Sequence, residues 1–165
     1  MRDPSAWSKR LPVLATALAG LGIATYLTLY QVGAVSHVWE PFFGEGSRYI
    51  LKESAVARDL PIPDAALGAL AYLAEAVLEL VGGADRWRTK PWVVLLLGLT
   101  AAGLAVAAVV LVVLQAAVFR HFCTLCLTSA ACSLLGASFV PPEVLATLRH
   151  LRRPRSRSPA VGDNG

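Results

Sequence analysis

The sequence predicts an all-α integral membrane protein, in which four transmembrane helices form a bundle beneath an outer loop and short helix that act as a lid. Of its 165 residues, 56% are hydrophobic and only 16% are charged, and the mean hydropathy is +0.58. A soluble domain of this length carries more charge. Four apolar segments also reach the length of about 20 residues that a helix needs to cross roughly 30 Å of hydrocarbon.

The expected transmembrane helices span about 11–32, 62–81, 92–118 and 122–140. The third is the cleanest, because no charged residue interrupts it. The second contains Glu75 and Glu79, and their spacing of four places them on one helical face, pointing either into the bundle or towards the lipid headgroups. A short amphipathic re-entrant helix is the competing interpretation of this second segment.

The first apolar segment has some features of a cleavable signal peptide. Lys9 and Arg10 precede it, and ALAG (17–20) resembles a small-residue cleavage site. The apolar character continues well past that site, through LGIATYLTLY (21–30). This continuation favours retention of the segment as the first membrane helix.

The distribution of basic residues predicts the orientation of the bundle. Lysines and arginines gather in the flank 1–10, in the loop between the second and third helices, and in the tail 141–165. The loop 33–61 instead carries acidic residues that offset its basic ones. The positive-inside rule therefore places both termini in the cytoplasm and the lid, 33–61, outside. We expect the basic tail to contact anionic membrane lipid and not nucleic acid.

Cys123 and Cys126 begin the fourth helix at its outer end, which in a bacterium faces the oxidising compartment. Their spacing of three brings both sulfur atoms to one helical face, close enough for a disulfide. The helix N-terminus favours a thiolate, and Arg120 and His121 add cationic character there. Cys132, deeper in the same helix, is expected to be an inert small hydrophobe.

Two other interpretations of the Cys-x-x-Cys pair remain open. The pair can consist of small apolar side chains packed within a helix, or it can be half of a metal site. A metal site of this kind needs four ligands, and the sequence has no second cluster of cysteine or histidine. The sequence therefore favours a redox-active dithiol and no bound metal.

The outer loop 33–61 is expected to cover the cysteine pair. It contains a short helical pattern over 49–57 and enough apolar side chains for a lid, namely Phe42, Phe43, Tyr49, Ile50 and Leu51. A loop anchored at the membrane interface by its aromatic residues is the alternative. From the residues alone, Ser54 is most simply a solvated polar residue, and Asp64 the N-cap of the second helix.

Four segments in this order resemble the bacterial form of the vitamin K epoxide reductase family. They are GLGIATYLTLY (20–30), ILKES (50–54), PIPDAALGALAYL (61–73) and FCTLCLTSA (122–130). The resemblance implies a multi-pass protein of the bacterial inner membrane that holds a quinone, of the menaquinone or ubiquinone type, beside the dithiol. It implies an oxidoreductase that passes electrons from a separate thioredoxin-like protein on the outer side, through Cys123 and Cys126, to the quinone. This transfer supports disulfide-bond formation.

The resemblance also implies roles for individual residues. Cys126 faces the quinone and forms a transient adduct with it, whereas Cys123 exchanges with the cysteines that deliver electrons. Ser54 matches a serine that helps to shape the quinone pocket. Asp64 stands where relatives carry a polar residue that hydrogen-bonds a quinone carbonyl, and a carboxylate can donate such a bond only when it is protonated.

Two features depart from the family pattern. Relatives usually carry two more cysteines in the outer loop, but residues 32–61 contain none, and Ala130 stands where an aromatic residue is common. Either a partner dithiol reaches Cys123 directly through an opened lid, or the usual relay is absent. The alternative function is therefore a non-enzymatic partner subunit or ligand-binding protein on the same scaffold.

Overall fold

The structure of the protein, a computed structural model, describes residues 5–53 and 62–152. These residues contain helices and no strand, which confirms the all-α prediction. Four long helices dominate, namely α1 (Trp7–Gln31), α4 (Asp64–Leu80), α6 (Pro91–Val113) and α7 (Thr124–Phe139). Each lies within a few residues of a segment that the hydropathy pattern predicts.

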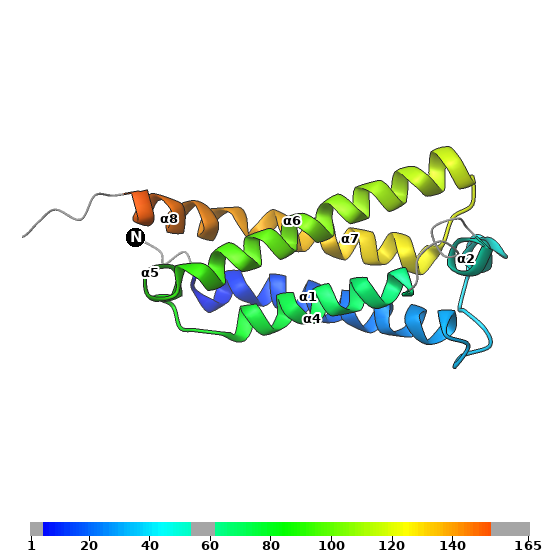
Figure 1. Ribbon diagram of the computed structural model, residues 1–165, viewed down its shortest axis with the longest axis horizontal. Helices are drawn as coiled ribbons and strands as arrows, with labels where there is room; N and C mark the ends of the chain where they lie inside the picture. Colours follow the sequence, from blue (N-terminus) through cyan, green and yellow to red (C-terminus); the bar gives the residue numbers. More distant parts are fainter. Residues whose placement is uncertain (1–4, 54–61, 153–165) are drawn as a thin grey trace, which may run out of the picture.

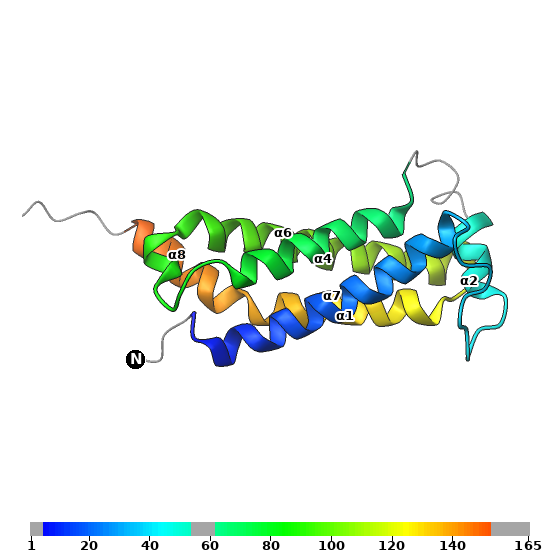
Figure 2. The same ribbon diagram turned by 90° about the horizontal axis from the view of Figure 1, so that it is seen from below.

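The four long helices form an elongated antiparallel bundle, in which α1 and α6 each pack against both α4 and α7 (Figures 1 and 2). One end, which we call the α8 end, holds the start of α1, α5 (Arg86–Thr89) and α8 (Pro141–Arg152). The other end, the lid end, carries α2 (Gly46–Arg48) and the π-helix η1 (Tyr49–Glu53). The expected short helix of the lid is therefore present, although residues 54–57 lie outside the described chain.

The surface of the bundle is apolar, whereas small residues line much of its interior. Within the described part of the chain, three helical stretches are long and apolar enough to span a membrane, namely Trp7–Gln31, Pro91–Phe119 and Thr124–Arg152. Large aliphatic side chains such as Leu18, Leu70 and Leu99 are exposed on the outside. An outer surface of this kind suits lipid, and the protein is accordingly a membrane protein.

Gly20 on α1 is one of the small residues that let the helices approach closely. The ring of Tyr72 from α4 lies directly over it, and a β-carbon at this position would overlap the ring. Close helix packing in membrane proteins generally depends on such small residues. Tyr72 can therefore cross the bundle between α1 and α4 and reach α7.

Arg86 joins three helices at the α8 end. Its side chain is 0% exposed. It donates to both carboxylate oxygens of Glu143 on α8, at 2.6 and 2.7 Å, and to Oε2 of Glu79 on α4, at 2.9 Å. Its Nη1 also donates to the carbonyl oxygens of Leu78 and Glu79 at the end of α4. The guanidinium group thus satisfies carboxylates and helix-end carbonyls that burial would otherwise leave unpaired.

Arg10 extends this network to α1. Its Nε donates to Oε2 of Glu79 at 3.2 Å, and its Nη1 donates to the carbonyl of Gly82 at 3.0 Å. Ser5 donates a hydrogen bond to Glu143 from the other side. Of the two orientations that the sequence leaves open for Glu79, the structure therefore selects the interior of the bundle.

Replacing Arg86 by methionine should destabilise the protein by about 3–5 kcal/mol, because it leaves the buried Glu143 without its cation. The midpoint of thermal unfolding in detergent measures the effect. The double variant R86M/E143L removes both charges and should be clearly more stable than R86M alone. Arg88, exposed and stacked over the Trp87 ring, provides the matched control R88M, which should stay near wild type. Equal destabilisation by R86M and R88M would contradict the role of the network.

Candidate redox site at the lid end

Cys123 and Cys126 form a disulfide at the start of α7, with their Cα atoms 5.2 Å apart. Cys123 is the N-cap of the helix in an extended conformation, and its sulfur accepts a hydrogen bond from the backbone N–H of Cys126 at 3.1 Å. It is 0% exposed, whereas Cys126 is partly exposed. The helix N-terminus therefore directs an N–H group at the buried sulfur, an arrangement that also stabilises a thiolate.

Gln115 holds the backbone of Cys123 from the neighbouring helix. Its Oε1 accepts a hydrogen bond from the backbone N–H of Cys123 at 3.2 Å, and its side chain is buried. Gln115 lies in η2 (Leu114–Phe119), a π-helical extension of α6. Such π-helical turns are frequently found at functional sites. Here the extension supplies the site with an amide from an otherwise apolar helix.

The two residues expected to support a thiolate, Arg120 and His121, are both exposed. Arg120 adopts a left-handed backbone conformation, with φ of 54°, in the short connection between η2 and α7. The ring of His121 stacks on Tyr49, with centroids 4.2 Å apart, and contacts the carbonyl oxygen of Phe119. His121 therefore joins α7 to the lid, and an electrostatic effect of either residue on the cysteines stays a prediction.

Glu40 connects the lid to the first turn of α7. Its Oε2 accepts a hydrogen bond from the backbone N–H of Thr124 at 3.0 Å, and its carboxylate also accepts from the hydroxyl groups of Thr124 and Ser47. Partial burial raises the pKa of Glu40, but these hydrogen bonds favour the charged form more strongly, so its pKa lies below the usual value. The carboxylate thus fills the electropositive helix end beside Cys123 and fastens the lid there.

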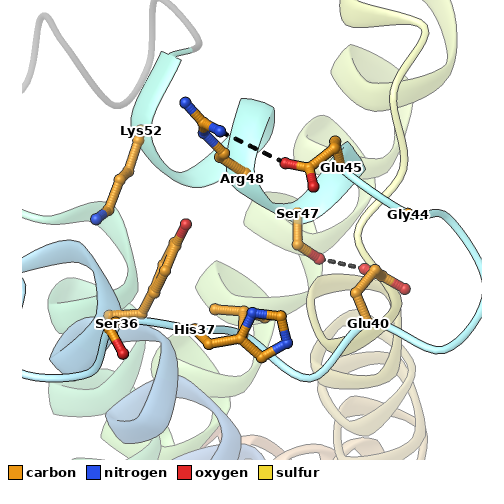
Figure 3. Close-up of a pocket in the computed structure, with 10 residues that line it drawn as sticks. Ser36, His37, Glu40, Gly44, Glu45, Ser47, Arg48 and Lys52 are labelled. Atoms are coloured by element: carbon orange, nitrogen blue, oxygen red, sulfur yellow. Dashed lines mark hydrogen bonds and ion pairs between the residues drawn. The ribbon is translucent and has the colours of Figure 1, made fainter.

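A polar pocket of about 620 Å³ lies within the lid, next to this carboxylate. Figure 3 shows Ser47 turned towards Glu40, and Arg48 paired with Glu45. Further polar lining comes from Ser36, His37 and Lys52. The pocket therefore presents charges of both signs close to the start of α7.

An apolar cavity of about 470 Å³ lies within the bundle and reaches Cys126 of the disulfide. Most of its wall comes from α4 and α6. A few polar or sulfur-bearing side chains reach it, namely Asp64, Tyr72, Gln115, Cys126, Ser129 and Ser133. Leu67 and Val110 also line it and are 47% and 50% exposed, so the cavity opens at the side of the bundle. This combination of size, apolar walls and few polar groups suits a flat, lipid-soluble ligand.

Asp64 is the first residue of α4, and Pro63 occupies the N-cap. The simple N-cap assignment is therefore wrong by one residue, because the chain enters the helix through Pro63. Gln31 of α1 donates to the Asp64 carboxylate and to the carbonyl of Leu51, and its Oε1 accepts from the N–H of Ala65. Asp64 is thus fixed at the rim of the cavity. Ser54, the other expected pocket residue, lies outside the described residues.

Sequence reasoning missed Glu40, Gln115 and Tyr72. The first turn of α7 contains no acidic residue, so the carboxylate at its N-terminus comes from a segment 84 positions away. The sequence shows Gln115 as an amide within a long apolar run. Its side chain reaches the cysteines only because this part of the chain is a π-helix. A buried tyrosine needs a partner for its hydroxyl, and Tyr72 finds that partner on α7.

A model of the vitamin K epoxide reductase family matches residues 11–140, most of the chain. The chain belongs to the vitamin K epoxide reductase family. No curated protein matches it. Members of this family are membrane oxidoreductases associated with quinones, so family membership agrees with the disulfide and the apolar cavity described above. Among residues 5–53 and 62–152, no group of three potential His, Cys, Asp or Glu ligands comes together.

Replacing Glu40 by glutamine should loosen the lid and accelerate reduction of the disulfide by a water-soluble phosphine about tenfold at neutral pH, because charge-assisted hydrogen bonds contribute about 1.5–3 kcal/mol. The folded-state pKa of Glu40 is lowered, so its stabilisation is complete above its ordinary pKa and disappears as the pH falls through the lowered value. The wild-type reduction rate should therefore rise in that acidic range, and the variant should lack this step.

Glu45→Gln provides the control for this experiment. Glu45 is a lid carboxylate whose side chain is 86% exposed and pairs with Arg48. The E45Q variant should keep the wild-type reduction rate and its acidic step. If E40Q and E45Q behave alike, Glu40 does not fasten the lid.

Proposed function

We propose that the protein is a membrane thiol:quinone oxidoreductase. It takes electrons from thiols of a partner protein, passes them through Cys123 and Cys126 to a membrane quinone, and so supports disulfide-bond formation. The proposal rests on the position of Cys126. Cys126 belongs to the disulfide and also lines the apolar cavity that opens at the side of the bundle.

The two cysteines differ in a way that supports different roles. Cys126 borders the cavity, so it is the sulfur placed to react with a ligand there, whereas Cys123 lies beneath the lid. A quinone bound in the cavity would accept two electrons and two protons and leave the pair oxidised. Asp64 and Gln115 are placed to hold polar atoms of such a ligand, and Tyr72 offers a hydroxyl at the cavity wall. Ser54 stays a predicted member of the pocket.

The electron donor that we propose is a separate thioredoxin-like protein at the lid end. Residues 33–61 contain no cysteine, so an outside thiol must reach Cys123 itself. Cys123 is buried, and Gly46 of the lid lies directly against the carbonyl of Phe122. Exchange therefore requires the lid to move. The mixed charges of the polar pocket give a water-soluble partner a surface to bind.

We place the protein in the bacterial inner membrane with four crossings and the lid end outside. The fourth crossing is α4, whose 17 residues extend about 25 Å and run along the bundle beside the longer helices. Basic residues of the α8 end then face the cytoplasm, where they contact anionic lipid headgroups. The basic residues of the flanks and of the loop between α4 and α6 support this orientation. The type of quinone, menaquinone or ubiquinone, follows from the host membrane.

Purified protein should oxidise dithiothreitol when a soluble quinone analogue is added, and the loss of quinone absorbance measures the rate. Replacing Cys123 or Cys126 by serine should lower this rate by at least about 100-fold, because each removes the disulfide. Cys132 is the matched control. It lies outside the disulfide, and C132S should keep the wild-type rate.

A second outcome would favour the non-enzymatic alternative. The missing loop cysteines permit a scaffold that binds a ligand or a partner without redox turnover. In that case the wild-type protein would bind the quinone analogue but would not oxidise dithiothreitol. The C126S variant would also trap no mixed disulfide with any partner in cells. Together these results would refute the oxidoreductase.

A further inference from the structure

Polar side chains from α1, α4, α5 and α7 form successive layers inside the bundle, running from the apolar cavity towards the α8 end. Tyr72, Glu75 and Glu79 project from one face of α4, because their spacings of three and four follow the helical repeat. All three are buried, and they span about 10 Å along the helix. The carboxylic residues are unusual here, since ionisable groups inside a membrane bundle generally mark a functional path.

The first layer borders the cavity. The hydroxyl of Tyr72 lies 2.5 Å from Oγ of Ser133 and 3.0 Å from Oγ of Ser129, both on α7, and 2.6 Å from the Ser129 carbonyl oxygen. Tyr72, Ser129 and Ser133 all line the cavity. Hydroxyl groups both donate and accept, so this cluster can hand a proton from one oxygen to the next.

The second layer contains Glu75 without a partner. It is 2% exposed, and no described residue donates a hydrogen bond to its carboxyl. Gly136 on α7 lies beside it, since a β-carbon there would be 3.7 Å from Oε1 of Glu75, an ordinary contact, and 3.0 Å from Oγ1 of Thr16, a tight one. Thr16 donates its own hydroxyl to carbonyls of α1. Ionising such an unpaired carboxyl is costly in an apolar interior, so Glu75 is a place where a proton can be held.

The third layer connects Glu75 to the α8 end. Glu79 lies one turn further along α4 and binds Arg10 and Arg86. One nitrogen of Arg10, Nη2, is buried with no hydrogen-bond partner among the described residues. Buried polar atoms of this kind are typically served by water. A Glu side chain has three rotatable bonds, so the carboxyl of Glu75 can turn towards this layer or towards Tyr72.

We propose that Glu75, with Tyr72 and Ser133, carries protons from the α8 end to the cavity when the quinone is reduced. The inference rests on the proposed function. Oxidation of one partner dithiol to a disulfide releases two electrons and two protons, and reduction of one quinone consumes two of each. The electrons enter through Cys123 and Cys126 at the lid end, where the thiol protons leave. The two protons consumed in the cavity enter through Glu75 from the opposite end.

Among the groups that surround it, Glu75 is the residue best suited to hold and pass on a proton. From its own helix, Tyr72 and Glu79 face it, and α1 contributes Thr16 and, further on, Arg10. Arg86 of α5 is fully engaged by Glu79 and Glu143. On α7, the thiol of Cys132 lies near Tyr72, and the buried side chains of α6 at this depth are apolar.

The proton path would make thiol oxidation electrogenic, because electrons and protons reach the cavity from opposite ends.

Vesicles containing the protein and a quinone, with a pH indicator trapped inside, test this directly. A reduced Cys-x-x-Cys peptide that cannot cross the bilayer is added outside, so only molecules with an outward lid end react. The lumen should become alkaline by two protons per quinone reduced. E75Q should reduce this alkalinisation at least tenfold and E75D should retain part of it, whereas D85N, which removes an exposed carboxylate before α5, should match wild type.

Infrared difference spectroscopy provides a readout that does not depend on turnover. Chemical reduction of a quinone bound in the cavity should shift a protonated-carboxyl band in the wild-type protein, and E75Q should lack this band. Thermal unfolding in detergent checks that E75Q is folded. If E75Q is not folded, S133A takes its place, because this variant also interrupts the path. Two results would refute the proton path, provided that quinone is reduced. Either the wild-type protein causes no lumenal alkalinisation, or E75Q and S133A cause as much of it as the wild type. If wild type reduces no quinone, the proposed function fails and the path with it.

Discussion

A polar group inside an apolar bundle must find its partner within the protein, and carboxylates meet this constraint at both ends of the molecule. At the α8 end, Glu79 and Glu143 neutralise Arg10 and Arg86 and thereby join α1, α4, α5 and α8. At the lid end, Glu40 fills the N-terminus of α7 and joins it to the lid. Unpaired buried charge is costly enough that these contacts restrict how the helices can pack.

The redox site follows from the same constraint. Glu40 occupies the helix end beside Cys123 and holds the lid there. While these contacts last, Cys123 is buried and a water-soluble thiol cannot reach it. Cys126 remains open to the apolar cavity. A partner thiol and a lipid-soluble acceptor would thus approach the same sulfur pair from different sides. Breaking the contacts of Glu40 with the first turn of α7 is the step that we propose to admit the partner.

Much of the fold was predictable, because hydropathy and helix length act locally. The four apolar segments all became helices, and the Cys-x-x-Cys pair fell at the start of α7 as its spacing indicates. The contacts of Glu40 and Glu143 were not predictable, since their partners lie 84 and 57 positions away along the chain. Nor does hydropathy show that Gln115 turns inward, because that depends on the π-helical end of α6.

If a quinone keeps the Cys123–Cys126 pair oxidised, as we propose, then a loss of quinone should change the thiol state of the pair in cells. Acid quenching followed by alkylation traps that state in cells with normal quinone levels and in cells whose quinone synthesis is blocked. We expect a disulfide in the first and an accumulating dithiol in the second. An unchanged thiol state after quinone depletion would contradict it.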